Sequence, residues 1–256
     1  MEKYLIVDIG NSVISVALFT NGKIEHRLDV KSDETHVAHI DEFLSSFVKD
    51  KKIKVKDVKD GLICSVVPQY SSSLKKAIKK VFGVSVSAMD SSFYEDVKMI
   101  VDDPKQVGGD IVADVVAAKE MFGGPLVVVD LGTISKNIIL DENNVFVGVS
   151  FFPGIQVCFN AMRSSTALLP GTELKRKPTK LVGNNTLEAL ESGVFYGTLN
   201  GIKSYVKEIE SNFSRPIKKI LTGGNSTLFA KELPDFIYDP DFVLKGIYIL
   251  FKNKRG

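Results

Sequence analysis

The chain has 256 residues, of which 44% are hydrophobic and 25% are charged, and this composition is typical of a globular protein with one large or two medium domains. Its 33 basic and 31 acidic residues leave a formal net charge of +2, which argues against a dedicated nucleic-acid-binding protein. No apolar run reaches the ~18 residues needed to cross a bilayer and no signal segment precedes the first predicted strand, so we expect a cytoplasmic protein without a membrane partner.

Apolar runs that end at turn residues alternate with helical patterns along the chain, and this alternation predicts an α/β architecture. In the first half we expect strands at 4–8, 12–19, 24–30 and 61–67, with helices at 35–50, 71–83 and 108–124. The helix at 71–83 starts with serines that can cap it and ends at a glycine. In the second half we expect strands at 126–130, 134–140, 145–152 and 218–222, with helices at 154–164, 186–212 and 241–252.

Two segments have nearly the same shape. "YLIVDIGNSVISVALF" (4–19) and "LVVVDLGTISKNIIL" (126–140) each run an apolar strand into Asp-x-Gly, followed by Asn or Thr and then by a second apolar strand. This repeat predicts a duplicated α/β unit, with domains at 1–111 and 112–256.

The Asp-x-Gly turns are suited to phosphate binding. Glycine lets the backbone bring its N–H groups close to a ligand, while the carboxylate can hold a cation or a metal-bound water. A single Asp-x-Gly is more often an ordinary turn, but two equivalent copies favour a pair that clamps a nucleotide triphosphate in a cleft between two halves. A third loop, "LTGGNS" (221–226), either offers bare backbone to a base or ribose or is a strand-to-helix turn with a serine cap.

"VDIGNS", "VDLGT" and "LTGG", in this order, resemble the phosphate and adenosine motifs of the acetate-kinase, sugar-kinase and actin superfamily. Within it, the chain resembles the type III pantothenate kinases over almost its whole length. Further matching segments are "SVVP" (65–68), "DPKQVGGD" (103–110), "PGIQ…TALLP" (153–170), "NNTLEALESGVFYG" (184–197) and "DFVLKGIY" (241–248). The resemblance implies an α/β fold of duplicated actin-like ATPase (ribonuclease H-like) domains with an ATP cleft between them.

The resemblance also implies an enzyme that transfers the γ-phosphoryl group of ATP to the primary hydroxyl of pantothenate, the first step of coenzyme A synthesis, with Mg²⁺ and a monovalent cation, K⁺ or NH₄⁺. Asp110 matches the catalytic acid, which would accept or orient the proton of the substrate hydroxyl. Asp8 matches a Mg²⁺ site, and Asp130 the site of the monovalent cation. The positions that match ATP-binding residues are Asp8, Gly10, Asn11, Ser12, Gly132, Thr133, Thr222, Gly223 and Gly224. Those that match the pantothenate pocket are Gly108, Gly109 and Thr186.

Four positions depart from the family pattern. Ile111 stands where an arginine would clamp the pantothenate carboxylate, and the loss of such a charge-assisted contact, roughly 1.5–3 kcal/mol, predicts weaker substrate binding. Lys136 replaces a threonine, Ile138 an acid and Val149 a glycine. We interpret Lys136 as an exposed strand lysine; the alternatives are a substitute for the lost positive charge or an ammonium tethered in the place of the cation. Asp114, one turn after the catalytic acid, is interpreted as an ordinary acid near a helix start.

Three functions remain open. The first is a working pantothenate kinase with an altered substrate pocket. The second is a degenerate subunit of a hetero-oligomer, because family members resemble one another in being dimers, so we expect a homodimer or a heterodimer with a related member. The third is a non-catalytic ATP-binding or regulatory protein, since a fold alone does not determine function.

Overall fold

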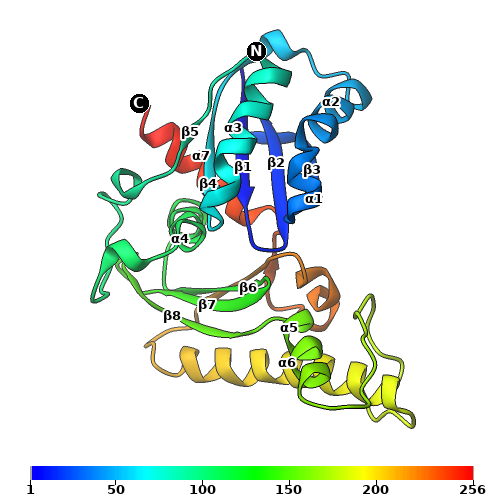
Figure 1. Ribbon diagram of the computed structural model, residues 1–256. Coiled ribbons are helices and arrows are strands. Elements are labelled where there is room, and N and C mark those ends of the chain that lie inside the picture. Colours follow the sequence, from blue (N-terminus) through cyan, green and yellow to red (C-terminus); the bar gives the residue numbers. More distant parts are fainter. Residues whose placement is uncertain (1, 256) are drawn as a thin grey trace. The chain divides into compact units, whose positions relative to one another are not determined.

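The computed structural model describes residues 2–255, whose elements are labelled in Figure 1. The strands form two five-stranded sheets, in the orders β3-β2-β1-β4-β5 and β10-β9-β6-β7-β8. Contacts divide the chain into two compact units. One comprises the described residues of Met1–Lys98, Asp102–Ala117 and Val243–Gly256, and the other comprises Met99–Val101 and Ala118–Phe242. No helix within residues 2–255 is at once long enough and apolar enough to span a membrane.

The first unit is built on the sheet β3-β2-β1-β4-β5. Its strands are β1 Lys3–Ile9, β2 Val13–Thr20, β3 Lys23–Lys31, β4 Val58–Ser65 and β5 Ser87–Ala88. The helices that lie in it for most of their length are α1 Glu34–Ala38, α2 Ile40–Asp50, α3 Pro68–Phe82, α4 Gly109–Met121 and α7 Phe242–Asn253. Short 3₁₀ turns occur at Val55–Asp57, Ser91–Phe93 and Pro104–Gln106.

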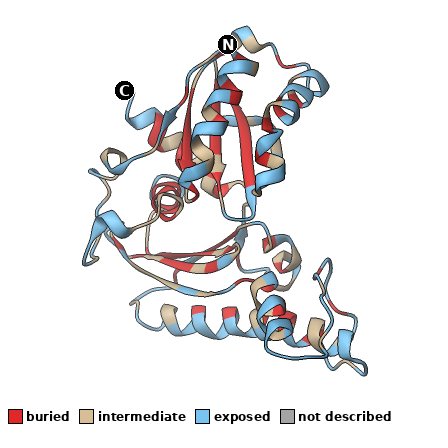
Figure 2. Cartoon of the chain, in the orientation of Figure 1, coloured by how far each residue is buried: buried red, intermediate tan, exposed pale blue. Residues whose placement is uncertain are grey.

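The central strands of this unit are apolar on both faces because helices cover both. Leu5 of β1 belongs to a buried cluster with Leu44 of α2 and Leu74 of α3. Tyr4, the residue before Leu5 in β1, points to the other face of the sheet, where its ring lies 5.3 Å from that of Phe251 in α7. Figure 2 shows the resulting burial along β1 and β2. Strands covered on two faces read as continuous apolar runs, and this explains the sequence of β1.

The second unit is built on the sheet β10-β9-β6-β7-β8. Its strands are β6 Leu126–Leu131, β7 Ile134–Leu140, β8 Phe146–Pro153, β9 Lys218–Thr222 and β10 Ile237–Tyr238. Its helices are α5 Ile155–Ser164 and α6 Thr186–Glu210, with 3₁₀ turns at Ser226–Leu228 and Ala230–Glu232. Val127 and Val129 of β6 form a buried cluster with Phe159 of α5 and Phe195 of α6, so one face of the sheet packs against these two helices (Figure 1).

The two sheets have the same topology. In each, the first strand is antiparallel to the second and parallel to the fourth, the second is antiparallel to the third, and the fourth is parallel to the fifth. Agreement over all five strands confirms the duplicated α/β unit that the repeated Asp-x-Gly segments predict.

Two predicted helix boundaries are wrong. α3 begins at Pro68 and not at the serines from position 71 onward. Proline is favoured at the first position of a helix, where its missing N–H would have no partner within the helix. The helix expected at 35–50 is two helices that meet at His39, which ends α1 and precedes α2.

The compact units do not coincide with the predicted domains at 1–111 and 112–256, which describe the sequence repeat and stay a prediction. α4 remains in the first unit as far as Ala117, and α7 returns to it from the end of the chain. A Cβ added to Gly246 of α7 would lie 1.9 Å from the carbonyl oxygen of Ala113 in α4, so the two helix backbones are in close contact. A repeat in the sequence carries no information on such a return.

Candidate active site

The first Asp-x-Gly turn joins β1 to β2 and is open to solvent. Asp8 is the penultimate residue of β1. Gly10 closes the turn by donating its N–H to the carbonyl of Val13 at 3.0 Å, and a Cβ at Gly10 would come within 3.1 Å of the same oxygen. Asn11 and Ser12 are exposed. The turn therefore presents an amide and a hydroxyl side chain next to a carboxylate, and the close approach at its base favours glycine.

The second Asp-x-Gly turn joins β6 to β7 and is braced by two other loops. Asp130 is the penultimate residue of β6, and Gly132 and Thr133 are half-buried. Asn225 donates a side-chain N–H to the carbonyl of Gly132 at 3.3 Å, and Gly154 donates its N–H to the carbonyl of Thr133 at 3.1 Å. A Cβ at Gly154 would lie 2.3 Å from the Gly132 carbonyl oxygen, so only glycine fits there. The backbone of this turn is held in place before any ligand binds.

The "LTGG" loop packs directly against Asp130. Thr222 is buried at the end of β9 and is the parallel partner of Asp130 in the sheet. Gly223 has a φ of +92°, and a Cβ there would lie 2.3 Å from Oδ1 of Asp130 and 2.5 Å from the backbone nitrogen of Leu131. At Gly224 a Cβ would meet no heavy atom of residues 2–255 within 4 Å. The first glycine is therefore required by packing, and the second leaves open backbone beside it.

Asp110 lies in the first turn of α4. Its Oδ1 accepts the backbone N–H of Ile111 at 2.9 Å. A carboxylate at this end of a helix is stabilised in its ionised form by the helix dipole. A Cβ at Gly108 would lie 2.6 Å from the same Oδ1. Glycine at 108 thus gives the Asp110 carboxylate the space it occupies.

Gly109 lies against the side chains of Cys64 and Tyr94. A Cβ at Gly109 would lie 2.9 Å from Sγ of Cys64 and 3.2 Å from the hydroxyl oxygen of Tyr94. Burial, and after it the nearby Cys64 and Asp110, raise the pKa of Tyr94, which keeps its hydroxyl protonated as a hydrogen-bond donor. No motif marks Tyr94 in the sequence, because it stands in a loop and reaches α4 only through the fold.

Comparison with known proteins identifies the family. The model of the type III pantothenate kinase family matches residues 4–208. A protein of Agathobacter rectalis described as a type III pantothenate kinase is 30% identical over 261 aligned positions, which cover 98% of this chain and 98% of that protein. The chain belongs to the type III pantothenate kinase family.

Solved structures support the fold of this family member. A protein of Sinorhizobium meliloti described as a 2-dehydro-3-deoxygalactonokinase is 14% identical, with a TM-score of 0.58 over 98% of this chain and 96% of that one. The activator of the 2-hydroxyisocaproyl-CoA dehydratase from Clostridium difficile, solved with bound ADPNP, is 13% identical, with a TM-score of 0.57 over 99% and 96%. With the repeated sheet topology, these likenesses give the chain the duplicated actin-like ATPase fold.

Two residues of α4 bear on the pantothenate kinase pattern. Ile111, at the position where the resemblance implies an arginine, is 5% exposed and belongs to the first unit. Asp114 is fully buried on the same helix. The interpretation of Asp114 as an ordinary acid near a helix start is therefore wrong, because such acids are solvated whereas this one lies among apolar neighbours of α4.

Lys136 contacts Asp130. Its Nζ lies 2.7 Å from Oδ2 of Asp130, and the two side chains are 12% and 14% exposed. The interpretation of Lys136 as an exposed strand lysine is wrong. The two residues are directly opposite each other in the antiparallel pair of β6 and β7, so their side chains lie on the same face of the sheet. The register of a short hairpin around Gly132 and Thr133 is the sequence signal that could have revealed this pair.

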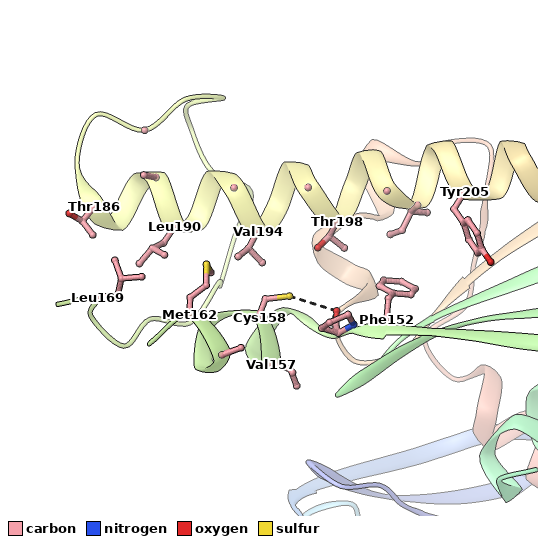
Figure 3. A pocket seen from close by; sticks show the side chains of 18 of the residues that line it. Phe152, Val157, Cys158, Met162, Leu169, Thr186, Leu190, Val194, Thr198 and Tyr205 are labelled. Atoms are coloured by element: carbon pink, nitrogen blue, oxygen red, sulfur yellow. Dashed lines mark hydrogen bonds between the residues drawn. The ribbon is translucent and has the colours of Figure 1, made fainter. Parts of the chain in front are cut away.

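Thr186 is part of an apolar pocket between α5, α6 and β8 (Figure 3). The pocket has a volume of about 1370 Å³. Thr186 begins α6, and Leu190 and Val194 point from that helix toward Cys158 and Met162 of α5. Burial raises the pKa of the Cys158 thiol. Three glycines on α6 open the pocket further, and with a Cβ they would meet no heavy atom of the described chain within 4 Å; they are Gly193, Gly197 and Gly201. Their spacing of four residues is the sequence signal for this pocket.

The structure groups the predicted site residues into three sets. One set is in the first unit: Asp8, Gly10, Asn11, Ser12, Gly108, Gly109 and Asp110. A second set surrounds the β6–β7 turn: Asp130, Gly132, Thr133, Thr222, Gly223 and Gly224. Thr186 stands apart from this second set, because α6 packs on the face of the sheet that carries Val129, whereas Asp130 points to the opposite face.

Proposed function

We propose that this chain transfers the γ-phosphoryl group of ATP to the primary hydroxyl of pantothenate. The observation that carries the proposal is its full-length match to the type III pantothenate kinases, with three acids retained at motif positions, Asp8, Asp110 and Asp130. Phosphoryl transfer asks little covalent chemistry of a protein, so positioned donors and charges supply most of the catalysis.

Asp8 is assigned to Mg²⁺. Within residues 2–255 no cluster of three or more His, Cys, Asp or Glu side chains is placed to hold a metal ion. Mg²⁺ in kinases is usually held by one or two carboxylates together with waters and substrate phosphates, so a single strand-end carboxylate fits this ion when ATP supplies the other oxygens. Held there, Mg²⁺ would neutralise negative charge on the phosphate groups.

The two turns are assigned to ATP phosphates. In the first, exposed Asn11 and Ser12 add side-chain donors to the backbone around Gly10. In the second, Gly132 and Thr133 are held by neighbouring loops, so little conformational entropy is lost when they bind an anion. Thr222, Gly223 and Gly224 are assigned to the adenosine part, where open backbone at Gly224 leaves room for a flat group.

Asp110 is assigned as the general base. Its carboxylate is at the start of α4, from which it would accept the proton of the substrate hydroxyl. The protonated hydroxyl of Tyr94, beside Gly109, is a suitable donor to a polar group of the substrate. Gly108 and Gly109, close to the Asp110 carboxylate in sequence, are assigned to pantothenate, and Ile111 adds no charge to hold the pantothenate carboxylate. Thr186, in the second unit, is assigned to pantothenate from the family match alone.

The assay that tests this function measures ADP release with ATP, Mg²⁺ and K⁺, with and without pantothenate. We expect pantothenate to stimulate ADP release, and Asp110→Asn to abolish it while ATP still raises the Tm. Glu120→Gln on the same helix is the matched control, because Glu120 is an exposed acid near the other end of α4, with its carboxylate 3.6 Å from Nζ of its exposed neighbour Lys119. Full activity of Asp110→Asn would contradict the role of Asp110.

The buried side chain of Ile111 supports a second candidate, a subunit that depends on a partner. We propose that the chain acts in the cytoplasm as a homodimer or as a heterodimer with a related family member that carries the missing arginine. To distinguish the homodimer from the heterodimer, ADP release is measured in the presence of pantothenate, first for the chain alone and then for the chain mixed with such a family member. Activity only in the mixture would favour the heterodimer, and ATP binding without turnover in either would favour a non-catalytic ATP-binding protein.

A further inference from the structure

The carboxylate of Asp130 already has a positive partner within the chain. Nζ of Lys136 lies 2.7 Å from Oδ2 of Asp130, and neither side chain is more than 14% exposed. The pair is fixed by strand register, since the two residues face each other across β6 and β7. An ion pair so withdrawn from solvent is screened little by salt and stays formed at physiological ionic strength.

The other oxygen of Asp130 is enclosed by backbone. The position of a Cβ on Gly223 would be 2.3 Å from Oδ1, which means that the backbone at 223 approaches this oxygen closely. Thr222 is the neighbour of Asp130 on the β9 side of the sheet, as Lys136 is on the β7 side. The carboxylate thus has an ammonium against one oxygen and the backbone of the "LTGG" loop against the other.

A bound monovalent cation does not fit this arrangement. K⁺ or NH₄⁺ at Asp130 would require the oxygen to which Lys136 is hydrogen-bonded, or would stand beside the lysine ammonium and share the carboxylate of Asp130 with it. Two positive charges held at one carboxylate repel each other strongly in a partly buried site. A lysine ammonium carries one positive charge, like NH₄⁺, and donates up to three hydrogen bonds, one fewer than NH₄⁺ can donate.

We propose that the ammonium of Lys136 is a built-in monovalent cation, and that this chain needs neither K⁺ nor NH₄⁺ where other chains with an unpaired acid at this place would bind one. The inference rests on the proposed function in one respect, namely that the turn of Gly132 and Thr133 binds ATP phosphates. Lys136 is then a positioning residue that balances Asp130 and keeps a positive charge beside that turn.

The first test uses the unaltered chain. We measure Tm with and without Mg²⁺-ATP, and pantothenate-dependent ADP release, in KCl, NH₄Cl or tetramethylammonium chloride at one ionic strength. Tetramethylammonium is too large to enter a site made for K⁺. We expect the same Tm in all three salts. We also expect turnover rates that agree within about twofold. A requirement of the unaltered chain for K⁺ or NH₄⁺ in either readout would overturn the proposal.

The second test removes the ammonium. Lys136→Thr leaves a residue that strands accept and frees Asp130 to bind a cation. We expect its Tm to rise in KCl or NH₄Cl relative to tetramethylammonium chloride, and its turnover to fall about tenfold in tetramethylammonium chloride and to recover in K⁺ or NH₄⁺. Lys136→Arg keeps the charge and should stay independent of cations. Lys80→Ala is the matched control, because it removes a lysine–aspartate pair in which the lysine is 73% exposed.

The outcomes separate this inference from the proposed function. If neither the unaltered chain nor any variant phosphorylates pantothenate, but K⁺ or NH₄⁺ raises the Tm of Lys136→Thr alone, the inference about Lys136 is supported and the kinase proposal fails. If folded Lys136→Thr shows no cation effect on Tm or turnover, Lys136 replaces no cation and the inference fails. Should that variant not fold, the salts applied to the unaltered chain and to Lys136→Arg decide.

Discussion

The two Asp-x-Gly turns are alike in sequence but differ in what stands opposite the acid. Across the first hairpin Asp8 faces Ser15, whose hydroxyl donates to Asp29 at 2.7 Å. Across the second, Asp130 faces Lys136, whose ammonium bonds to it. The first turn is solvent-exposed, whereas the second is braced by neighbouring loops. One local motif therefore places its acid opposite a neutral hydroxyl residue in the first hairpin and opposite a positive charge in the second.

The largest expected effect is on turnover, from loss of the first acid. Asp8→Asn should lower pantothenate-dependent ADP release by on the order of 10²–10³-fold, because a charged stabiliser of phosphate groups is removed. Its Tm without ligand should fall less than that of Asp130→Ala, because the turn residues that follow it, Asn11 and Ser12, are exposed. Steady-state ADP release over a Mg²⁺ titration, with Tm measured in parallel, checks this. A large fall in Tm would mean that Asp8, like Asp130, mainly holds the fold.

Loss of the second acid should act on stability. Asp130→Ala leaves the partly buried ammonium of Lys136 without its carboxylate, and we expect a loss of about 3 kcal/mol, or about 10 °C in Tm. The double variant Asp130→Ala/Lys136→Ala should recover part of this loss, because no unbalanced charge remains. Thermal and urea unfolding measure both. Asp41→Ala, which removes the half-buried partner of the exposed Lys80, is the control and should have little effect. Equal stability of the single and double variants would contradict the pairing.

Replacing the glycine near each acid should likewise cost more stability in the second turn than in the first. Gly223→Ala places a Cβ 2.3 Å from Asp130 at a φ of +92°, and should destabilise the chain by about 2 kcal/mol. Among residues 2–255, a Cβ at Gly10 meets only the carbonyl oxygen of Val13, at 3.1 Å, so Gly10→Ala should lose under about 1 kcal/mol. Urea unfolding of both variants gives the ranking. The reverse ranking would show that the first turn is the more tightly packed.

The smallest expected effect on stability comes from removing a hydrogen bond that holds the second turn. Asn225→Ala removes one hydrogen bond, to the carbonyl of Gly132, and should destabilise by about 1 kcal/mol. Asn11→Ala in the exposed first turn should stay within about 0.5 kcal/mol. ATP affinity, measured by calorimetry, should weaken for both variants if both turns bind phosphates. Unchanged affinity for either variant removes that turn from the ATP site.

Much of the fold follows from local patterns. Buried strands such as β1 and β6 are continuous apolar runs, and the repeated Asp-x-Gly segments predict the duplication that the two sheets display. The start of α3 was placed wrongly because serines and Pro68 compete as signals for the same helix. β5 and β10 were not predicted, since strands of two residues leave no periodicity to detect.

The sequence by itself determined the family, the repeated strand-turn-strand units and the positions of Asp8, Asp110 and Asp130 in the chain. These depend on residues close together in sequence, where backbone preferences and apolar periodicity act. Only the tertiary structure decided that Lys136 is withdrawn from solvent and bonded to Asp130, that Ile111 and Asp114 are buried, and that Tyr94 lies beside Gly109. Burial and ion pairing are set by strand register and by helices that return from distant parts of the chain, as α7 does. The same lysine in a sequence can therefore be exposed or paired within the protein. Which of the two holds depends on the residue that the fold places opposite the lysine.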